Sequence, residues 1–271
     1  MLILEVLFIV FGMCLLVTAV GFRKTVWFVS VGYAFSFVAV SAAFCLSFYQ
    51  QLHWYNWFQI AGILAWGLRL GLFIVRRERN ESYHQLVSDL TSKAQNIPLQ
   101  AKIGVWVSVS VTYTCMFAPV VFATQTKFTL GMWLSPVVYT GLFIMYLGLF
   151  IESIADFQKS YYKRSNPEEF VQKGLFSWVR YPNYFGELLV WVGSFIVGFP
   201  FYQTWWQWLI VAFGMISIFG VMISSTVRLE RKQFIRHRGK KSYQDYIKSV
   251  PILFPGLPIY SLQHLKEEPE V

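Results

Sequence analysis

Runs of about 20 apolar residues, almost free of charge, recur along this chain and restrict what it can fold into, because each is long enough to cross a bilayer. Hydrophobic residues make up 56% of the sequence and charged residues only 14%, which excludes an ordinary soluble domain. We therefore predict an all-α integral membrane protein with about seven transmembrane helices. The expected spans are residues 2–20, 26–48, 54–75, 103–124, 131–151, 184–199 and 205–227.

Lys and Arg residues gather on one side of such a seven-helix chain. All but one of the 23 fall in alternate connections or in the C-terminal segment, and the exception is Lys127. Because Lys and Arg are enriched in cytoplasmic loops, this pattern predicts an external N-terminus and a cytoplasmic C-terminus. The net charge of +9 then matches anionic lipid headgroups as partners, and it indicates no nucleic acid.

The stretch from Gly174 to Phe195 combines polar groups with the start of an apolar run. Arg180 precedes Pro182, and a proline suits the first turn of a helix. The free amides of a helix start, together with the positive end of its dipole, favour an anion. Asn183 and Glu187 follow, and an ionisable group inside an apolar span is a functional-site hypothesis. This stretch predicts a site for a phosphate-bearing ligand whose polar head reaches Glu187.

The preceding span ends in a second polar stretch. Glu152 and Asp156 are four residues apart, so on a helix both carboxylates share one face, and Lys163 lies near that face. An ordinary charged helix end is the alternative interpretation. The site is favoured because Asp156 and Glu187 flank the same cytoplasmic connection, which also carries Arg180.

After the last span, basic residues and tyrosines follow closely. Arg228 and Arg231 are candidates to bind phosphate, and Tyr243 and Tyr246 are candidates to contact a ring or ribose. For the run Arg236 to Lys241 a polybasic tail is the preferred interpretation. The four histidines are scattered and the three cysteines lack paired spacing, so we predict no metal site.

Taken together, these motifs resemble the steroid 5-alpha-reductase family, and within it the bacterial branch grouped as a domain of unknown function. The resemblance covers about the C-terminal half. The residues that carry it are Glu152-xxx-Asp156-x-Gln158, Gly174-Leu175-Phe176, Arg180-Tyr181-Pro182-Asn183-Tyr184-Phe185-Gly186-Glu187 and Tyr243-Gln244-Asp245-Tyr246. Many relatives have a histidine where this chain has Tyr181, so no role that requires an imidazole there is carried over.

The resemblance implies a membrane reductase that uses NADPH and acts on CH–CH donors. Hydride would pass to a conjugated carbon–carbon double bond of a steroid-like or other lipid substrate. Residues 1–102 would form the substrate side, and residues 103–271 the reductase-like domain. A bacterial inner membrane, with the basic loops in the cytoplasm, is the expected location.

The same resemblance implies roles for individual residues. Asn183 and Asp156 would hold the cofactor, Glu187 would lie near the nicotinamide amide, and Arg180 and Arg231 would contact phosphate. Glu187 and Tyr184 are the candidate catalytic residues, with Tyr184 polarising the substrate carbonyl. The full set of predicted cofactor-binding residues is Glu152, Asp156, Lys163, Arg180, Asn183, Glu187, Arg228, Arg231, Tyr243 and Tyr246.

Two other classes of function stay open at this point. The Arg-x-Pro-x-Tyr-x-Gly frame and the Glu230-Arg231…Tyr243…Tyr246 tail also resemble isoprenylcysteine and phospholipid methyltransferases, which use S-adenosylmethionine. Asn183 and Glu187 favour the reductase. A lipid-binding protein without enzymatic activity is the third class, and it gives no reason for the polar residues of the two stretches.

Overall fold

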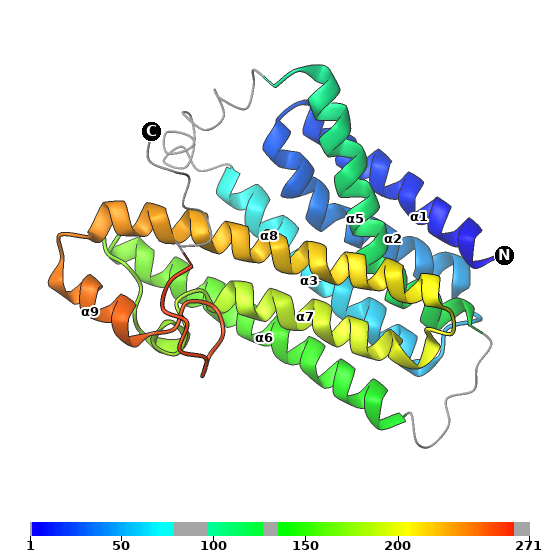
Figure 1. Cartoon of the computed structure of the whole chain (residues 1–271). Helices are drawn as coiled ribbons and strands as arrows, with labels where there is room; N and C mark the ends of the chain where they lie inside the picture. Colours follow the sequence, from blue (N-terminus) through cyan, green and yellow to red (C-terminus); the bar gives the residue numbers. More distant parts are fainter. Residues whose placement is uncertain (1, 79–96, 127–134, 263–271) are drawn as a thin grey trace. The chain divides into compact units, whose positions relative to one another are not determined.

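The computed structural model describes residues 2–78, 97–126 and 135–262, and within these ranges every regular element is a helix (Figure 1). Seven helices are long and apolar enough to cross a membrane, which confirms the predicted fold class. The long helices are α1 (Ile3–Thr18), α2 (Val31–Phe48), α3 (Trp54–Glu78), α5 (Leu99–Gln125), α6 (Ser135–Ser165), α7 (Pro182–Gly198) and α8 (Trp205–His237). A shorter helix, α9 (Lys241–Ser249), follows α8. Which end faces the cytoplasm stays a prediction.

Several predicted boundaries differ from the observed ones. Residues 26–30 belong to the connection between the first two spans, where the 3-10 helices η1 (Ala19–Phe22) and η2 (Thr25–Val29) precede α2. The Phe28 ring fills the space where a side chain at Gly21 would lie, and this contact holds the connection in that shape. At its C-terminal end α8 continues ten residues beyond the expected span, since no Gly or Pro interrupts it before Gly239. α9 was not predicted.

Pro119 lies inside α5, which runs through it as one continuous helix. α6 ends at Ser165, and residues 167–169 form a turn. The expectations for His84, Lys127 and His264 fall on residues outside the described ranges.

The chain forms two compact units. The first comprises Met1–Leu142 and Ser194–Met215, and the second comprises Phe143–Gly193 and Ile216–Val271. In the first unit α2 packs on α1 and α3, and α5 packs on α1. Gly67 of α3 allows the close approach of α2, because a Cβ there would lie 2.9 Å from the Ala34 carbonyl oxygen. The predicted division into residues 1–102 and 103–271 concerned function and stays a prediction.

In the second unit α6 and α7 touch backbone to backbone. A Cβ at Gly148 would lie 2.5 Å from the carbonyl oxygen of Gly186, and a Cβ at Gly186 would lie 2.7 Å from the amide nitrogen of Glu152. Only glycine permits such an approach, as in other close helix pairs of membrane proteins. This contact fixes the level at which the polar residues of α6 and α7 meet.

Candidate functional site

Two buried carboxylates flank the glycine contact between α6 and α7. Glu152 follows Gly148 by four residues on α6 and is 2% exposed, while Glu187 directly follows Gly186 on α7 and is 6% exposed. Asp156 lies one turn beyond Glu152 on the same face and is half-buried. Asn183, also half-buried, precedes Glu187 by four residues and shares its face. The structure thus brings four predicted site residues to one level of the second unit.

The start of α7 offers fewer free backbone amides to an anion than the sequence predicts. Pro182 is its first residue, as expected, and carries no N–H. The amides of Tyr184 and Phe185 both donate to the Tyr181 carbonyl oxygen, at 3.1 Å each. Among the first-turn residues Asn183 therefore carries the amide not committed to that carbonyl. The backbone contribution reduces to one donor, and the rest must come from side chains.

The segment before α7 is held by the chain that follows α9. The Arg180 amide donates to the Pro251 carbonyl oxygen at 2.9 Å, and the Tyr181 amide donates to that of Ile252 at 3.2 Å. Pro251 and Ile252 thus pair with the segment that leads into α7. This pairing positions the Arg180 side chain.

Arg180 forms a buried ion pair that the sequence did not predict. Its Nη2 lies 3.2 Å from Glu230 Oε1, and both side chains are 5% exposed. The same nitrogen donates to the carbonyl oxygen of Tyr260, while the Leu262 amide donates to Glu230 Oε2 at 3.1 Å. Arg180 Nε, also buried, has no hydrogen-bond partner among the residues that the structure describes. Arg180 therefore keeps one donor for a ligand while Glu230 holds the other side of its guanidinium.

Three tyrosines surround this ion pair. Tyr181, Tyr243 and Tyr246 are all buried, and the charges of Arg180 and its neighbours act on each of them. Burial raises the pKa of all three phenols, so they stay neutral hydrogen-bond donors at physiological pH. The Tyr246 hydroxyl donates to the Phe176 carbonyl oxygen at 2.7 Å. Tyr246 thus has a structural bond, whereas no such bond is shown for the hydroxyl of Tyr243.

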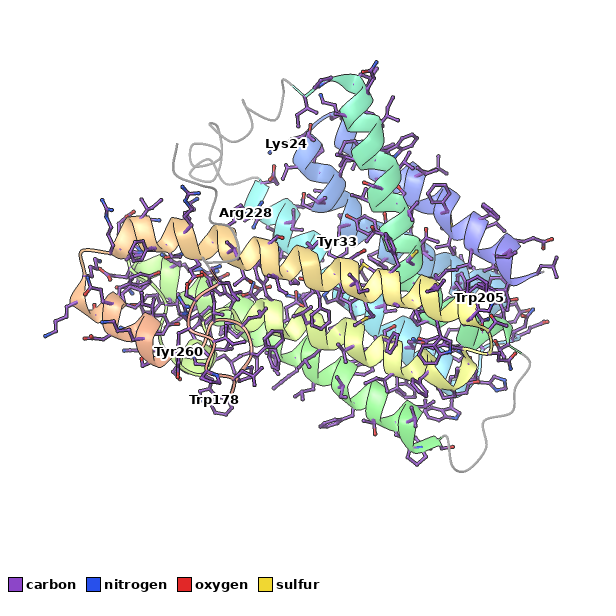
Figure 2. The ribbon with its side chains drawn as sticks, viewed as in Figure 1. Lys24, Tyr33, Trp178, Trp205, Arg228 and Tyr260 are labelled. Atoms are coloured by element: carbon purple, nitrogen blue, oxygen red, sulfur yellow. The ribbon has the colours of Figure 1, made fainter. Side chains whose placement is uncertain are left out.

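One face of α8 carries the polar residues of this site. Thr226, Glu230, Gln233 and His237 recur three or four residues apart, and all but the half-buried Gln233 are buried. Arg228 and Arg231 are exposed and occupy other faces of the helix; Figure 2 labels Arg228 on α8. Unlike Arg180, these two predicted residues are therefore exposed, and their role in binding phosphate stays a prediction. Counting residues in steps of three and four from Glu230 would have found the buried face.

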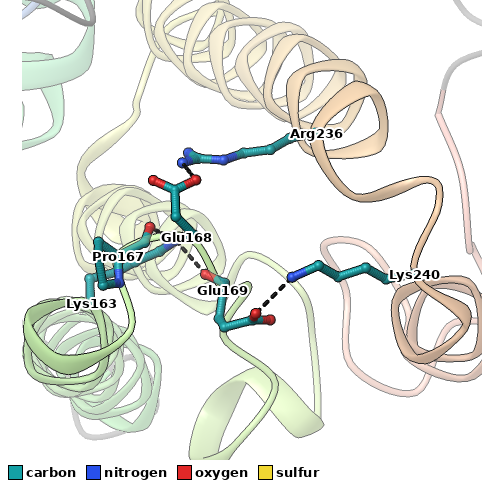
Figure 3. Close-up of polar contacts among 6 residues, drawn as sticks. All are labelled: Lys163, Pro167, Glu168, Glu169, Arg236 and Lys240. Carbon is teal, nitrogen blue, oxygen red and sulfur yellow. Dashed lines mark hydrogen bonds and ion pairs between the residues drawn. The ribbon is translucent and has the colours of Figure 1, made fainter.

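Lys163 belongs to a second polar cluster, shown in Figure 3. Its ammonium donates to the carbonyl oxygens of Pro167, at 3.0 Å, and of Glu169. Glu168 pairs with Arg236, and the Glu169 carboxylate accepts from Lys240 at 2.7 Å. The hydrogen bond from Arg236 lowers the pKa of Glu168, and the bond from Lys240 lowers that of Glu169. The cluster fixes the turn after α6 to the end of α8.

Two of the sequence motifs are joined by a single side chain. Gln158 Oε1 accepts the amide N–H of Leu175 at 3.0 Å. Gly174 has a φ of +67° and lies against the Gln158 side chain, where a Cβ would approach to 2.6 Å. Glycine is therefore required there both by the backbone conformation and by the contact. The Glu152-xxx-Asp156-x-Gln158 motif and the Gly174-Leu175-Phe176 motif thus form one structural element.

These features define a class of protein. The chain is a multi-pass helical membrane protein with two buried carboxylates, a buried arginine ion pair and three buried tyrosines in one of its units. Its described residues contain no group of His, Cys, Asp and Glu side chains able to hold a metal ion.

Comparison with known families identifies the family of this chain. Residues 17–250 match the family described as protein of unknown function (DUF1295), and the chain belongs to that family. Comparisons with curated proteins and with solved structures gave no match.

Proposed function

We propose that this protein is a membrane-embedded reductase that binds NADPH and reduces a conjugated carbon–carbon double bond of a lipid. The observation that carries the proposal is the group of acidic and amide side chains at the Gly148–Gly186 contact. Glu152, Glu187 and Asn183 lie there, and the resemblance to steroid 5-alpha-reductases assigns Asn183 and Glu187 to the cofactor. Two buried carboxylates, one on each helix of a membrane helix pair, are costly, which favours a functional reason for them.

The residues fit the parts of a dinucleotide. Buried carboxylates accept hydrogen bonds, so Glu187 and Glu152 suit the amide of a nicotinamide, and Asn183 adds a donor and an acceptor. The unpartnered Nε of Arg180 is a buried cationic donor that suits a phosphate oxygen. When bound, the cofactor supplies the hydride; the protein supplies its binding and orientation.

Tyr184 is the candidate proton donor. Its ring stacks on that of Tyr181, with centroids 6.0 Å apart and planes 18° apart, and it is half-buried at the start of α7. A phenol held in this way can donate a hydrogen bond to the carbonyl of an enone and polarise it. The expected substrate is a neutral, lipid-like enone, and a steroid is one member of that class.

A methyltransferase that uses S-adenosylmethionine is the second candidate, and one observation favours it. The two parts of the methyltransferase-like frame meet in the structure, since Arg180 pairs with Glu230 and both act on Tyr243. The reductase hypothesis also gives a role to the buried carboxylates of α6 and α7, Glu152 and Glu187, which the methyltransferase-like frame does not include. The two candidates therefore differ in which half of the site binds the ligand.

Sidedness is part of the proposal. We place the Arg180 ion pair, the Lys163 cluster and α9 on the cytoplasmic side of a bacterial inner membrane, because Lys and Arg concentrate in those segments. A single cysteine introduced at the exposed Lys248 should react with an impermeant thiol reagent in inverted vesicles and stay unreactive in intact cells. Reaction in intact cells would reverse the topology.

The test of the function is thermal unfolding of detergent-purified protein with NADPH, NADH or S-adenosylmethionine. A ligand that binds the native state alone raises the melting temperature by mass action. NADPH should raise it and S-adenosylmethionine should not. The converse result would replace the reductase with the methyltransferase, and no rise with any of the three would reject both.

A further inference from the structure

Two amide side chains are completely buried in the first unit. Asn56 and Gln59 of α3 are each 0% exposed. They are three residues apart, so they lie on the same face of the helix, one turn from each other. Neither belongs to the sequence motifs that resemble the reductases or the methyltransferases.

The backbone fixes how both amides are oriented. The His53 amide N–H donates to Asn56 Oδ1 at 3.0 Å, and a backbone N–H can only donate. Gln59 Nε2 donates at 3.0 Å to the carbonyl oxygen of Ser194, which can only accept, and lies 3.0 Å from the Ser194 hydroxyl. A flip of either amide would place two donors or two acceptors in contact, so the positions of nitrogen and oxygen are determined.

Each amide therefore leaves a defined atom without a partner. Asn56 Nδ2, a donor, and Gln59 Oε1, an acceptor, are buried and form no hydrogen bond. Buried polar atoms are nearly always paired in folded proteins, because an unpaired one destabilises the fold. Two residues one helical turn apart thus offer one unpaired donor and one unpaired acceptor.

The surroundings restrict the chemistry of that group. Tyr55 precedes Asn56 and Ile60 follows Gln59 in sequence, and both are buried. The Tyr55 ring stacks on that of the buried Phe201, with ring centroids 5.3 Å apart. Residues 54–68 of α3, which surround the two amides along the helix, contain no Asp, Glu, Lys or Arg, so an ion would find no counter-charge on this part of the helix. A carbonyl oxygen would satisfy Asn56 alone. A hydroxyl accepts from Asn56 and donates to Gln59, and so serves both.

We propose that Asn56 and Gln59 bind the hydroxyl group of a neutral lipid. α3 is one of the candidate membrane spans, and its neighbouring side chains Trp57 and Phe58 are 41% and 55% exposed, so lipid chains can reach this helix. Water offers the same hydrogen bonds, and the experiment below separates the two sources. The site stands whether or not the second unit is a reductase.

The test compares an alcohol with its ether in maltoside micelles. Dodecanol should raise the melting temperature of the wild-type protein by about 3 °C at saturation, whereas dodecyl methyl ether, which cannot donate, should not. Gln59→Met removes the acceptor and should abolish the rise. Gln207→Met is the matched control, because Gln207 is also buried in this unit but its Oε1 already accepts the amides of Gln203 and Thr204.

A rise with dodecanol in the wild type and in Gln207→Met, but not in Gln59→Met, supports the lipid hydroxyl. Equal rises with alcohol and ether, an unchanged rise in Gln59→Met, or no rise in the wild type overturn it; the last result would mean that water alone bridges the two amides. Should Gln59→Met fail to fold, Asn56→Ala removes the donor with a smaller side chain and must likewise lose the rise.

Discussion

The two units bury different kinds of polar side chain. Among the described residues, the charged residues that are buried as a whole lie in the second unit, namely Glu152, Arg180, Glu187 and Glu230, whereas Arg69 of the first unit is half-buried. The first unit buries hydroxyls and amides, such as Ser110, Asn56 and Gln59. Buried charges need ionic partners or ligands, whereas neutral groups are satisfied by single hydrogen bonds. The contrast indicates a polar, charged ligand for the second unit and a neutral one for the first.

Loss of Glu230 is the change expected to destabilise the protein most. Glu230→Ala leaves Arg180 buried without its ion partner, and breaking such a pair costs about 3–5 kcal/mol in free energy of unfolding. Denaturation followed by tryptophan fluorescence measures the effect, since the chain has 11 Trp residues. Glu168→Ala is the control, because the side chain of Glu168 is 78% exposed and its loss should change little. Equal effects would remove the contrast between buried and exposed pairs.

Gly186→Ala should come next. The new methyl group would overlap the backbone of α6, and overpacking of this kind costs about 1–3 kcal/mol. Gly220→Ala on α8 is the matched control, because nothing lies within 4 Å of a Cβ there and alanine favours a helix. Thermal unfolding of the two variants should move in opposite directions. A stable Gly186→Ala protein would mean that α6 and α7 are not in close contact.

A smaller effect is expected in the first unit. Ser194→Ala removes one of the two partners of Gln59 Nε2 and keeps the Ser194 carbonyl oxygen, so the free energy of unfolding should fall by about 1 kcal/mol. The same denaturation assay applies. A loss as large as that of Glu230→Ala would show that the neutral groups of this unit matter as much as the charges of the other.

The smallest effect concerns acid stability. The pKa values of Glu168 and Glu169 are lowered by Arg236 and Lys240, so the stability that these carboxylates contribute is present above the ordinary carboxyl pKa and is lost as the pH falls through the lowered values. Between about pH 6 and about pH 3 the melting temperature of the Glu168→Gln, Glu169→Gln double variant should therefore fall less than that of the wild type. If the melting temperatures of both proteins fell equally with pH, the Glu168–Arg236 and Glu169–Lys240 pairs would not stabilise the fold.

Local rules predicted much of the fold. Seven apolar runs correctly predicted seven helices, and Pro182 correctly predicted the first turn of α7. Such features depend on a few neighbouring residues, so a single sequence is enough to find them.

Long-range pairing could not be predicted in the same way. Arg180 and Glu230 are 50 residues apart, and nothing local indicates that the arginine pairs with this carboxylate. Arg228 and Arg231 are basic and close to the last span, and this local signal predicts a role for them, whereas the helical period places Glu230, Thr226 and His237 on the buried face. The assignment of roles to the site residues stays a prediction.

Binding of NADPH to Glu187→Gln protein tests the central claim most directly. Titration of nicotinamide fluorescence with purified wild-type protein should saturate, and Glu187→Gln should bind at least about 10-fold more weakly while its melting temperature without ligand stays close to the wild-type value. Lys248→Gln, an exposed change on α9, should bind like the wild type. Full NADPH affinity in a folded Glu187→Gln protein would contradict the account.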